Sequence, residues 1–188
     1  RRRLDESVIG MRIHAWGLVA AFLAVTGTGA AQIGSSDEIS VSGVGAVKFG
    51  MTVEQAAAAG VPLTAAAHAA GARCFSAHPA GRPGLSFVVR DGTIVRADMV
   101  KPANLKTVDG FKRGDSETTV LSYYVATSGG ASDFPFSETS DVTLIASPEF
   151  SRGDGVRRLV YEITSANGVI AIHAGLVPRD LRRCASAA

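Results

Sequence analysis

The stretch that decides the fold reads LSFVVRDGTIVRADM and covers residues 85–99. Two runs rich in β-branched and aromatic residues, 85–89 and 93–99, flank the dipeptide Asp91-Gly92. An Asp-Gly pair between two such runs is a strong signal for a β-hairpin, because both residues accept the positive φ angles that a tight turn requires. The sequence therefore predicts an antiparallel hairpin in the first half of the chain.

A second stretch with the same plan reads LVYEITSANGVIAIHA and covers residues 159–174. Here Asn167-Gly168 supplies the turn, which lies 76 residues after the turn of the first hairpin. One further strand is expected before each hairpin, at residues 72–77 and 141–146. The two stretches thus predict two three-stranded antiparallel meanders.

A helix is expected before each meander, and in both cases it follows a glycine. The segment KFGMTVEQA at 48–56 can be aligned with KRGDSETTV at 112–120, an offset of 64 residues. Thr52 has a glutamine three positions later, so it is expected to be the N-cap of a capping box. Ser116 or Asp115 is the expected cap of the second helix. The apolar face expected for that second helix consists of Val120, Leu121 and Tyr124.

A helix followed by a three-stranded meander, present twice, predicts an α+β tandem repeat. One such unit covers little core by itself, so the two halves, at about 40–105 and 106–184, are expected to pack as a single domain over residues 32–188. The alanine-rich run at 65–70 could form another short helix. Residues 147–155 are mostly polar and are expected to form a long hairpin loop.

Residues 1–31 have the pattern of a secretory signal peptide with a short N-terminal extension. Met11 and Arg12 begin the positively charged region, and an apolar run follows at 15–25. The stretch 26–31 consists of small residues and threonine, which suits a signal peptidase. We therefore expect export, to the periplasm or as a secreted protein.

The alternative to a signal peptide is a membrane anchor. The apolar run of 11 residues is shorter than the roughly 20 residues that span a bilayer. No cysteine follows the cleavage region, which disfavours a lipid anchor. Cleavage after Ala30 or Ala31 would leave a mature protein without a membrane span. Residues 1–10 do not begin with Met, and we expect them to be an upstream extension.

The charge balance argues against a nucleic-acid partner. Residues 1–31 hold four of the 19 Lys and Arg side chains and two of the 17 Asp and Glu side chains, which leaves 15 of each sign in the remainder. A nucleic-acid-binding domain needs a basic surface, and the expected mature chain is neutral.

Cys74 and Cys184 are the two cysteines of the sequence, and both lie in the part expected to be exported. An even pair in an exported protein is typical of one disulfide. A metal pair is the weaker alternative, because no His or Cys stands at ligand spacing. Closing a loop of about 110 residues would stabilise the fold by on the order of 4–5 kcal/mol.

No motif for catalysis, a metal or a cofactor stands out. Ser116 beside Asp115 could be a nucleophile, but the chain has no Gly-x-Ser-x-Gly elbow. The helix starts at Thr52 and Ser116 could attract a phosphate, but no lysine follows as in a P-loop, and we interpret both residues as caps. His173 is expected on a sheet face. The histidines expected in the mature chain lie far apart in the sequence: His68, His78 and His173.

Five features together resemble a group of small exported bacterial proteins, most of them uncharacterised and some labelled lectins. These features are G-x-G-x-V-x-x-G-M-T at 43–52, Cys74, V-R-D-G at 89–92, T-x-x-G-x-x-x-G-D-S at 107–116, and Cys184. The Gly-Met-Thr helix start is also similar to the helix–sheet repeat of the β-lactamase inhibitor protein and of the small outer-membrane-assembly lipoprotein. The resemblance implies a tandem repeat with a concave sheet surface.

A concave sheet surface suits protein recognition. Phe134 and Phe136 lie in a stretch flanked by Ser and Gly and are candidate partner contacts, although burial in the core is the alternative. A lectin would need aromatic platforms, and the expected mature chain has no Trp and three Tyr. We therefore expect an exported, non-enzymatic binding or envelope-associated protein with a protein partner. The alternatives are a carbohydrate-binding protein and, less favoured, a cryptic hydrolase.

Thiol titration tests the predicted Cys74–Cys184 disulfide. The mature protein, isolated from the oxidising compartment and unfolded without reductant, should show no reactive thiol, because both sulfurs are bonded to each other. A reduced sample serves as the positive control. Two thiols titrating before reduction would refute the bridge.

Overall fold

The computed structural model describes residues 32–128, 132–133, 141–147, 150–152 and 155–176. The chain is α+β, as the sequence predicts, with mostly strands and two helices in the described part. The strands are β1 (Glu38–Ser40), β2 (Gly43–Val44), β3 (Val47–Lys48), β4 (Leu63–Ala65), β5 (Cys74–Pro79), β6 (Leu85–Arg90), β7 (Thr93–Met99), β8 (Lys106–Thr107), β9 (Ser132–Asp133), β10 (Thr143–Ala146), β11 (Phe150–Arg152), β12 (Gly155–Thr164) and β13 (Gly168–Gly175), and the helices are α1 (Val53–Ala58) and α2 (Glu117–Ser128).

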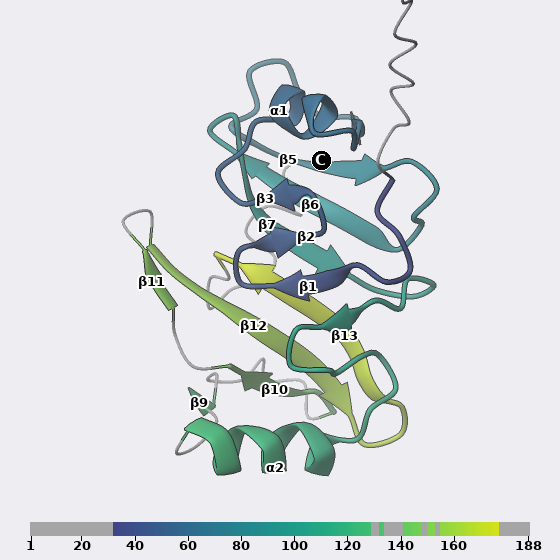
Figure 1. The fold of residues 1–188 in the computed structure, drawn as a ribbon, viewed down its shortest axis with the longest axis vertical. Coiled ribbons are helices and arrows are strands. Elements are labelled where there is room, and N and C mark those ends of the chain that lie inside the picture. The colour runs from purple at the N-terminus through teal and green to yellow at the C-terminus, as the bar shows by residue number, and fades with distance from the viewer. Residues whose placement is uncertain (1–31, 129–131, 134–140, 148–149, 153–154, 177–188) are drawn as a thin grey trace, which may run out of the picture.

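One large sheet runs in the order β4-β5-β6-β7-β13-β12-β10-β9, with β11 added against β12 (Figure 1). Its two hairpins, β6–β7 and β12–β13, are joined by antiparallel pairing of β7 with β13. In this pairing Met99 lies opposite Ile172, and Ala97 lies opposite Ala174. All four side chains are buried in the core, so the centre of the sheet is held by apolar contacts on one face.

The two hairpin turns differ in length. Arg90 pairs with Thr93, so the first turn has two residues, and Asp91 and Gly92 both have positive φ angles of 50° and 79°. In the second hairpin Gly168 is the first residue of β13 and pairs with Thr164, which leaves a three-residue loop. The turn at Asn167-Gly168 is therefore one residue longer than the turn at Asp91-Gly92, and the left-handed Gly168 closes it.

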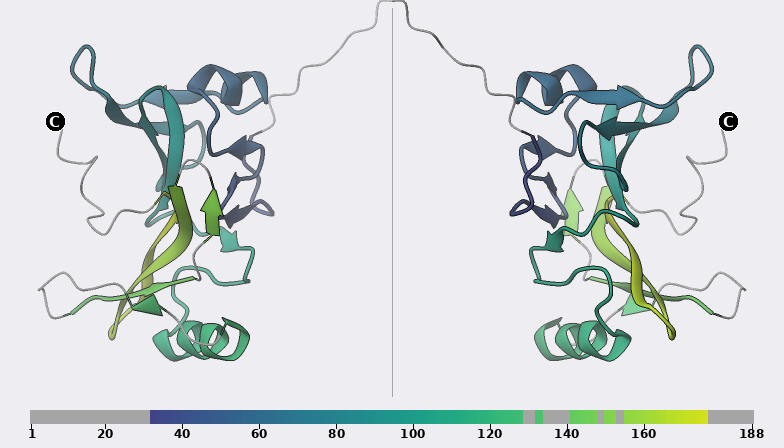
Figure 2. Two further views of the ribbon diagram at one scale, coloured as in Figure 1. Left: turned by 90° about the vertical axis from the view of Figure 1, so that its left-hand side faces the viewer. Right: turned by 90° about the vertical axis from the view of Figure 1, so that its right-hand side faces the viewer.

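A second, smaller sheet in the order β3-β2-β1-β8 was not predicted. Its strands are two or three residues long, and β1 pairs in parallel with β8, which is distant in the sequence. The buried side chains of Ile39, Val44 and Val47 belong to the same core as those of the large sheet. This sheet and both helices lie on one side of the large sheet (Figure 2), so the main core lies between these layers.

Both helices begin at the hydroxyl residues named above. The hydroxyl of Thr52 accepts from the Gln55 amide at 3.2 Å, and the Gln55 side chain accepts from the Thr52 amide at 2.9 Å. The hydroxyl of Ser116 accepts from the Thr119 amide at 3.2 Å. Each helix start thus has one of its otherwise unpaired amides satisfied by a side chain.

Two local expectations are wrong. No helix forms at 65–70: β4 pairs with β5 instead, and the strand contact continues with an Ala66 amide bond to Ser76. An isolated helix of that length is marginal, whereas the edge of β5 offers ready partners. Within 147–155, residues 150–152 form β11 and pair with the beginning of β12, so this segment includes a strand.

Replacing Thr52 with Ala should lower the free energy of unfolding by about 0.5–2 kcal/mol, because the first turn of α1 loses its cap. Thr52→Ser keeps the accepting hydroxyl and is the matched control. Chemical denaturation measures both variants. Equal stability of Thr52→Ala and wild type would contradict a role of this cap in folding.

Candidate functional site

The residues singled out in the sequence lie in separate parts of the fold. Thr52 and Ser116 begin the two helices, and Cys74 is the half-buried first residue of β5. Cys184, Phe134 and Phe136 lie outside the described residues. The disulfide and the two phenylalanine contacts therefore stay predictions.

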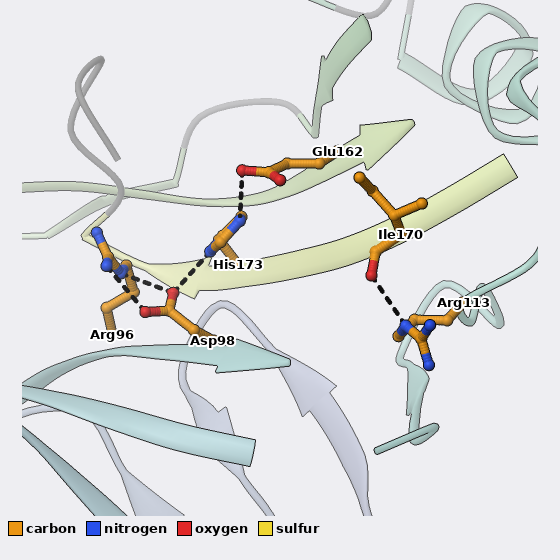
Figure 3. A network of polar contacts seen from close by, with 6 residues as sticks. All are labelled: Arg96, Asp98, Arg113, Glu162, Ile170 and His173. Carbon is orange, nitrogen blue, oxygen red and sulfur yellow. Dashed lines mark hydrogen bonds and ion pairs between the residues drawn. The ribbon is translucent and has the colours of Figure 1, made fainter. Parts of the chain in front are cut away.

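The structure instead brings four charged side chains together where β7 meets β13 (Figure 3). His173 on β13 lies opposite Asp98 on β7. Its Nδ1 is 2.7 Å from Asp98 Oδ1, and its Nε2 is 3.1 Å from Glu162 Oε1 on β12. Arg96 binds the same aspartate, with Nη2 2.8 Å from Asp98 Oδ2 and Nε 2.7 Å from Oδ1. We call Arg96, Asp98, Glu162 and His173 the seam network.

Strand alternation explains why these side chains meet. Successive residues of a strand point to opposite faces, and the neighbours Ala97 and Met99 belong to the core. Asp98 therefore points to the opposite face of the sheet, and the register places His173 beside it. The network joins β7, β13 and β12 by charge on the face away from the core.

Burial and charge act in opposite directions on His173, which is 8% exposed. Burial lowers the pKa of the imidazole, but hydrogen bonds and charges from Asp98 and Glu162 outweigh it and raise the pKa to about 9. For Asp98, burial raises the pKa, and the bonds to His173 and Arg96 outweigh it, so the pKa is lowered. At neutral pH the network thus holds two cations and two carboxylates.

This arrangement does not suit acid–base catalysis. A general base needs a lone pair directed at the substrate, whereas both ring nitrogens of a cationic histidine are donors. Both donors of His173 are taken by carboxylates. The network therefore acts as a set of ion pairs that holds three strands together.

Sequence reasoning placed His173 on a sheet face but missed its partners. Asp98 is 75 residues away and becomes a neighbour through the register of β7 and β13. A usable signal was present, because Asp98 and His173 are polar residues within strands that are otherwise mostly apolar. Pairing them required the strand order, which the sequence did not reveal.

The second notable feature is the surface of α2. Val120 and Tyr124 are buried on one side of this helix. The Tyr124 hydroxyl donates to Asp109 at 2.6 Å and lies 3.0 Å from the Tyr161 hydroxyl. Burial raises the pKa of both phenols, so both stay neutral; Tyr161 and Asp109 raise the pKa of Tyr124 further, whereas the hydrogen bonds of Tyr161 to Thr107 and Tyr124 oppose the effect of burial on Tyr161. These bonds anchor α2 through a single stripe of side chains.

The rest of α2 is exposed, and the prediction that Leu121 belongs to its buried face is wrong. Leu121 is 37% exposed, Tyr123 is 36% exposed and Val125 is 55% exposed. Val108, which precedes the aspartate that binds Tyr124, is 51% exposed. Leu121 and Val125 lie one turn apart on the same side of α2, and we call these two residues the α2 patch. Together with Val108 and Tyr123 they are four of the six large apolar side chains exposed by the described residues.

Comparison with protein-family models, curated proteins and solved structures finds no significant match to this chain. Across the described residues, no group of three or more His, Cys, Asp or Glu side chains is arranged to hold a metal ion. Neither helix of the described part is long and apolar enough to cross a membrane. The seam network and the α2 patch are therefore the features of the described residues that bear on function.

The seam network predicts that stability falls as pH rises from about 6.5 to about 9. Below this pH window His173 is protonated in both the folded and the unfolded chain. Within the window His173 stays protonated in the folded chain but loses its proton in the unfolded chain. Across the whole window the free energy of unfolding should fall by on the order of 3 kcal/mol. Denaturation at a series of pH values measures it.

His173→Gln should remove this part of the pH dependence, because glutamine does not titrate. His78→Gln, at an exposed histidine, is the matched control and should keep the slope of the wild type. If the wild type and His173→Gln lost stability in parallel across the window, the ion pairs of His173 would not be the cause.

Proposed function

We propose that this chain is an exported, non-enzymatic protein-binding module of the cell envelope, built from two half-repeats and closed by a Cys74–Cys184 disulfide. The exposed α2 patch carries the proposal of a protein partner. The resemblance to exported tandem-repeat proteins supports export and the repeat. The partner itself is identified by the experiment below.

The repeat is supported by equivalent contacts in the two halves. The amide of Gly50 donates to Ile94 at 2.8 Å, and the Ile94 amide donates back to the residue after Gly50 at 2.8 Å. In the second half the Gly114 amide donates to the Val169 carbonyl at 2.8 Å, and the Val169 amide donates back to the Asp115 carbonyl at 2.9 Å. In both halves the turn before a helix is thus bound to the beginning of a return strand. Both glycines also have positive φ angles, 100° and 90°.

The α2 patch has the composition of a protein-binding surface. Protein interfaces are depleted of charge at their centres, and the patch consists of two exposed aliphatic side chains one turn apart on α2. A surface helix that only covers a core needs a single apolar stripe, which Val120 and Tyr124 already provide. The additional apolar side chains of α2 are therefore explained by a partner.

The seam network supports a non-enzymatic role. Both ring nitrogens of its histidine are bonded to carboxylates, so neither is left for a substrate. Ser116, the candidate nucleophile, uses its hydroxyl to cap α2 and to bond Thr119 at 2.8 Å. Neither group is arranged for the attack or proton transfer that a hydrolase requires.

Site-specific photocrosslinking in native envelopes tests the proposal. A photoactivatable phenylalanine derivative at position 125 should give a discrete protein adduct, and the same group at position 156, exposed on β12, should not. The affinity of the captured partner should then fall at least about tenfold in the double variant Leu121→Ser/Val125→Ser, because interface energy concentrates in a few apolar contacts.

The matched control is Val100→Ser/Val156→Ser, which removes two exposed apolar side chains away from α2 and should leave the affinity unchanged. Circular dichroism establishes that both double variants are folded. Equal weakening by the two double variants would contradict the assignment of the interface to α2. Saturable sugar binding on a glycan array, with no protein adduct from position 125, would favour the carbohydrate-binding alternative instead.

A further inference from the structure

A basic pocket lies between the segment after β7, the turn before α2 and the β12–β13 hairpin. It has a volume of about 550 Å³ and is open to solvent on one side. Its polar lining residues are Lys101, Asn104, Arg113 and Asn167, and its apolar lining residues include Pro102 and Ile170. No Asp or Glu is among its lining residues. The pocket therefore presents hydrogen-bond donors and positive charge to whatever enters it.

Arg113 is the best-fixed group of this pocket. Its Nε donates to the Ile170 carbonyl at 2.9 Å (Figure 3), and its Nη1 donates to the Ala103 carbonyl at 3.2 Å. A guanidinium has five N–H donors, so three remain after these two bonds. No carboxylate of the described residues pairs with Arg113. The nearest in sequence, Asp115, accepts from the Lys112 amide at 2.8 Å.

Two glycines hold the walls close together. A Cβ at Gly168 would collide with the carbonyl of Asp115, so the β12–β13 turn lies directly against the turn before α2. A Cβ at Gly84 would collide with the carbonyl of Val100, so the segment with Lys101 is fixed against the start of β6. The backbone segments that carry the donors, and the guanidinium of Arg113, are thus held in place before a ligand arrives, which lowers the entropy cost of binding.

Lys101, Asn104 and Asn167 complete the donor set. All three residues are exposed, and the structure gives none of their side chains a partner among the described residues. The ammonium of Lys101 contributes three N–H donors, and each carboxamide contributes two. Neither Lys101 nor Arg113 can accept a hydrogen bond. Together with Arg113 they exceed the acceptor capacity of one carboxylate. They match a group with several terminal oxygens and more than one negative charge.

We propose that this pocket binds the phosphoryl group of a small phosphate ester. The phosphoryl oxygens lie between Lys101 and Arg113, with the carboxamides of Asn104 and Asn167 at the sides. The volume exceeds that of a bare phosphate, so the rest of the ester lies against Pro102 and Ile170. The site is separate from the α2 patch, and its assignment does not rest on the proposed protein partner.

Glycerol 3-phosphate is the probe for this site, followed by amide chemical shifts and by calorimetry at constant ionic strength. Saturable binding should move the side-chain amide signals of Asn104 and Asn167. Lys101→Gln should weaken binding about tenfold, because a charged hydrogen bond is lost. Arg90→Gln removes the same charge at the end of β6, where Arg90 does not line the pocket, and should leave affinity unchanged.

Arg113→Lys retains the charge but loses the planar donor set, and it should weaken binding even where folding is preserved. The proposal would be overturned if Lys101→Gln and Arg90→Gln weakened binding equally, or if binding did not saturate. Vesicles with and without phosphatidic acid distinguish the source of the ester. Lys101-dependent binding to these vesicles alone would assign the pocket to a lipid headgroup, and binding of neither probe would overturn the site.

Discussion

The antiparallel pairing of β7 with β13 is the interaction on which the rest of the structure depends. It turns two hairpins, each with exposed edges, into one continuous sheet. On one face it buries apolar side chains, including Met99 and Ile172, against the small sheet. On the other face it brings Asp98 to His173 and so assembles the seam network. The small sheet packs over this seam, since β1 contacts β13 and β2 contacts β7.

Local elements could be predicted where the signal lies within a few residues. The Asp91-Gly92 hairpin and the caps at Thr52 and Ser116 depend on neighbours in the sequence, and the structure has both. The small sheet could not be predicted, because β1 finds its parallel partner β8 through the tertiary fold. The alanine run at 65–70 shows the converse, where local helix propensity was outweighed by an available strand edge.

The candidate site and the candidate binding surfaces depend even more on tertiary placement. His173 was expected on a sheet face, but its role follows from carboxylates on two other strands. Leu121 was expected in the core, and the anchoring of α2 through Tyr124 and Tyr161 instead leaves it exposed. The basic pocket combines three segments, and neither Lys101 nor Arg113 belongs to a recognisable motif for phosphate. Such sites become visible when the register and the close approach at Gly168 are known.

Native-state amide hydrogen exchange tests most directly whether the β7–β13 pairing unites the fold. The account predicts that the amides joining β7 to β13 are among the most protected, and that they open with the same free energy as the amides within the two hairpins. One cooperative unit requires this result, since each hairpin alone is at best marginally stable. Faster exchange at the β7–β13 amides, with each hairpin still protected, would contradict the account.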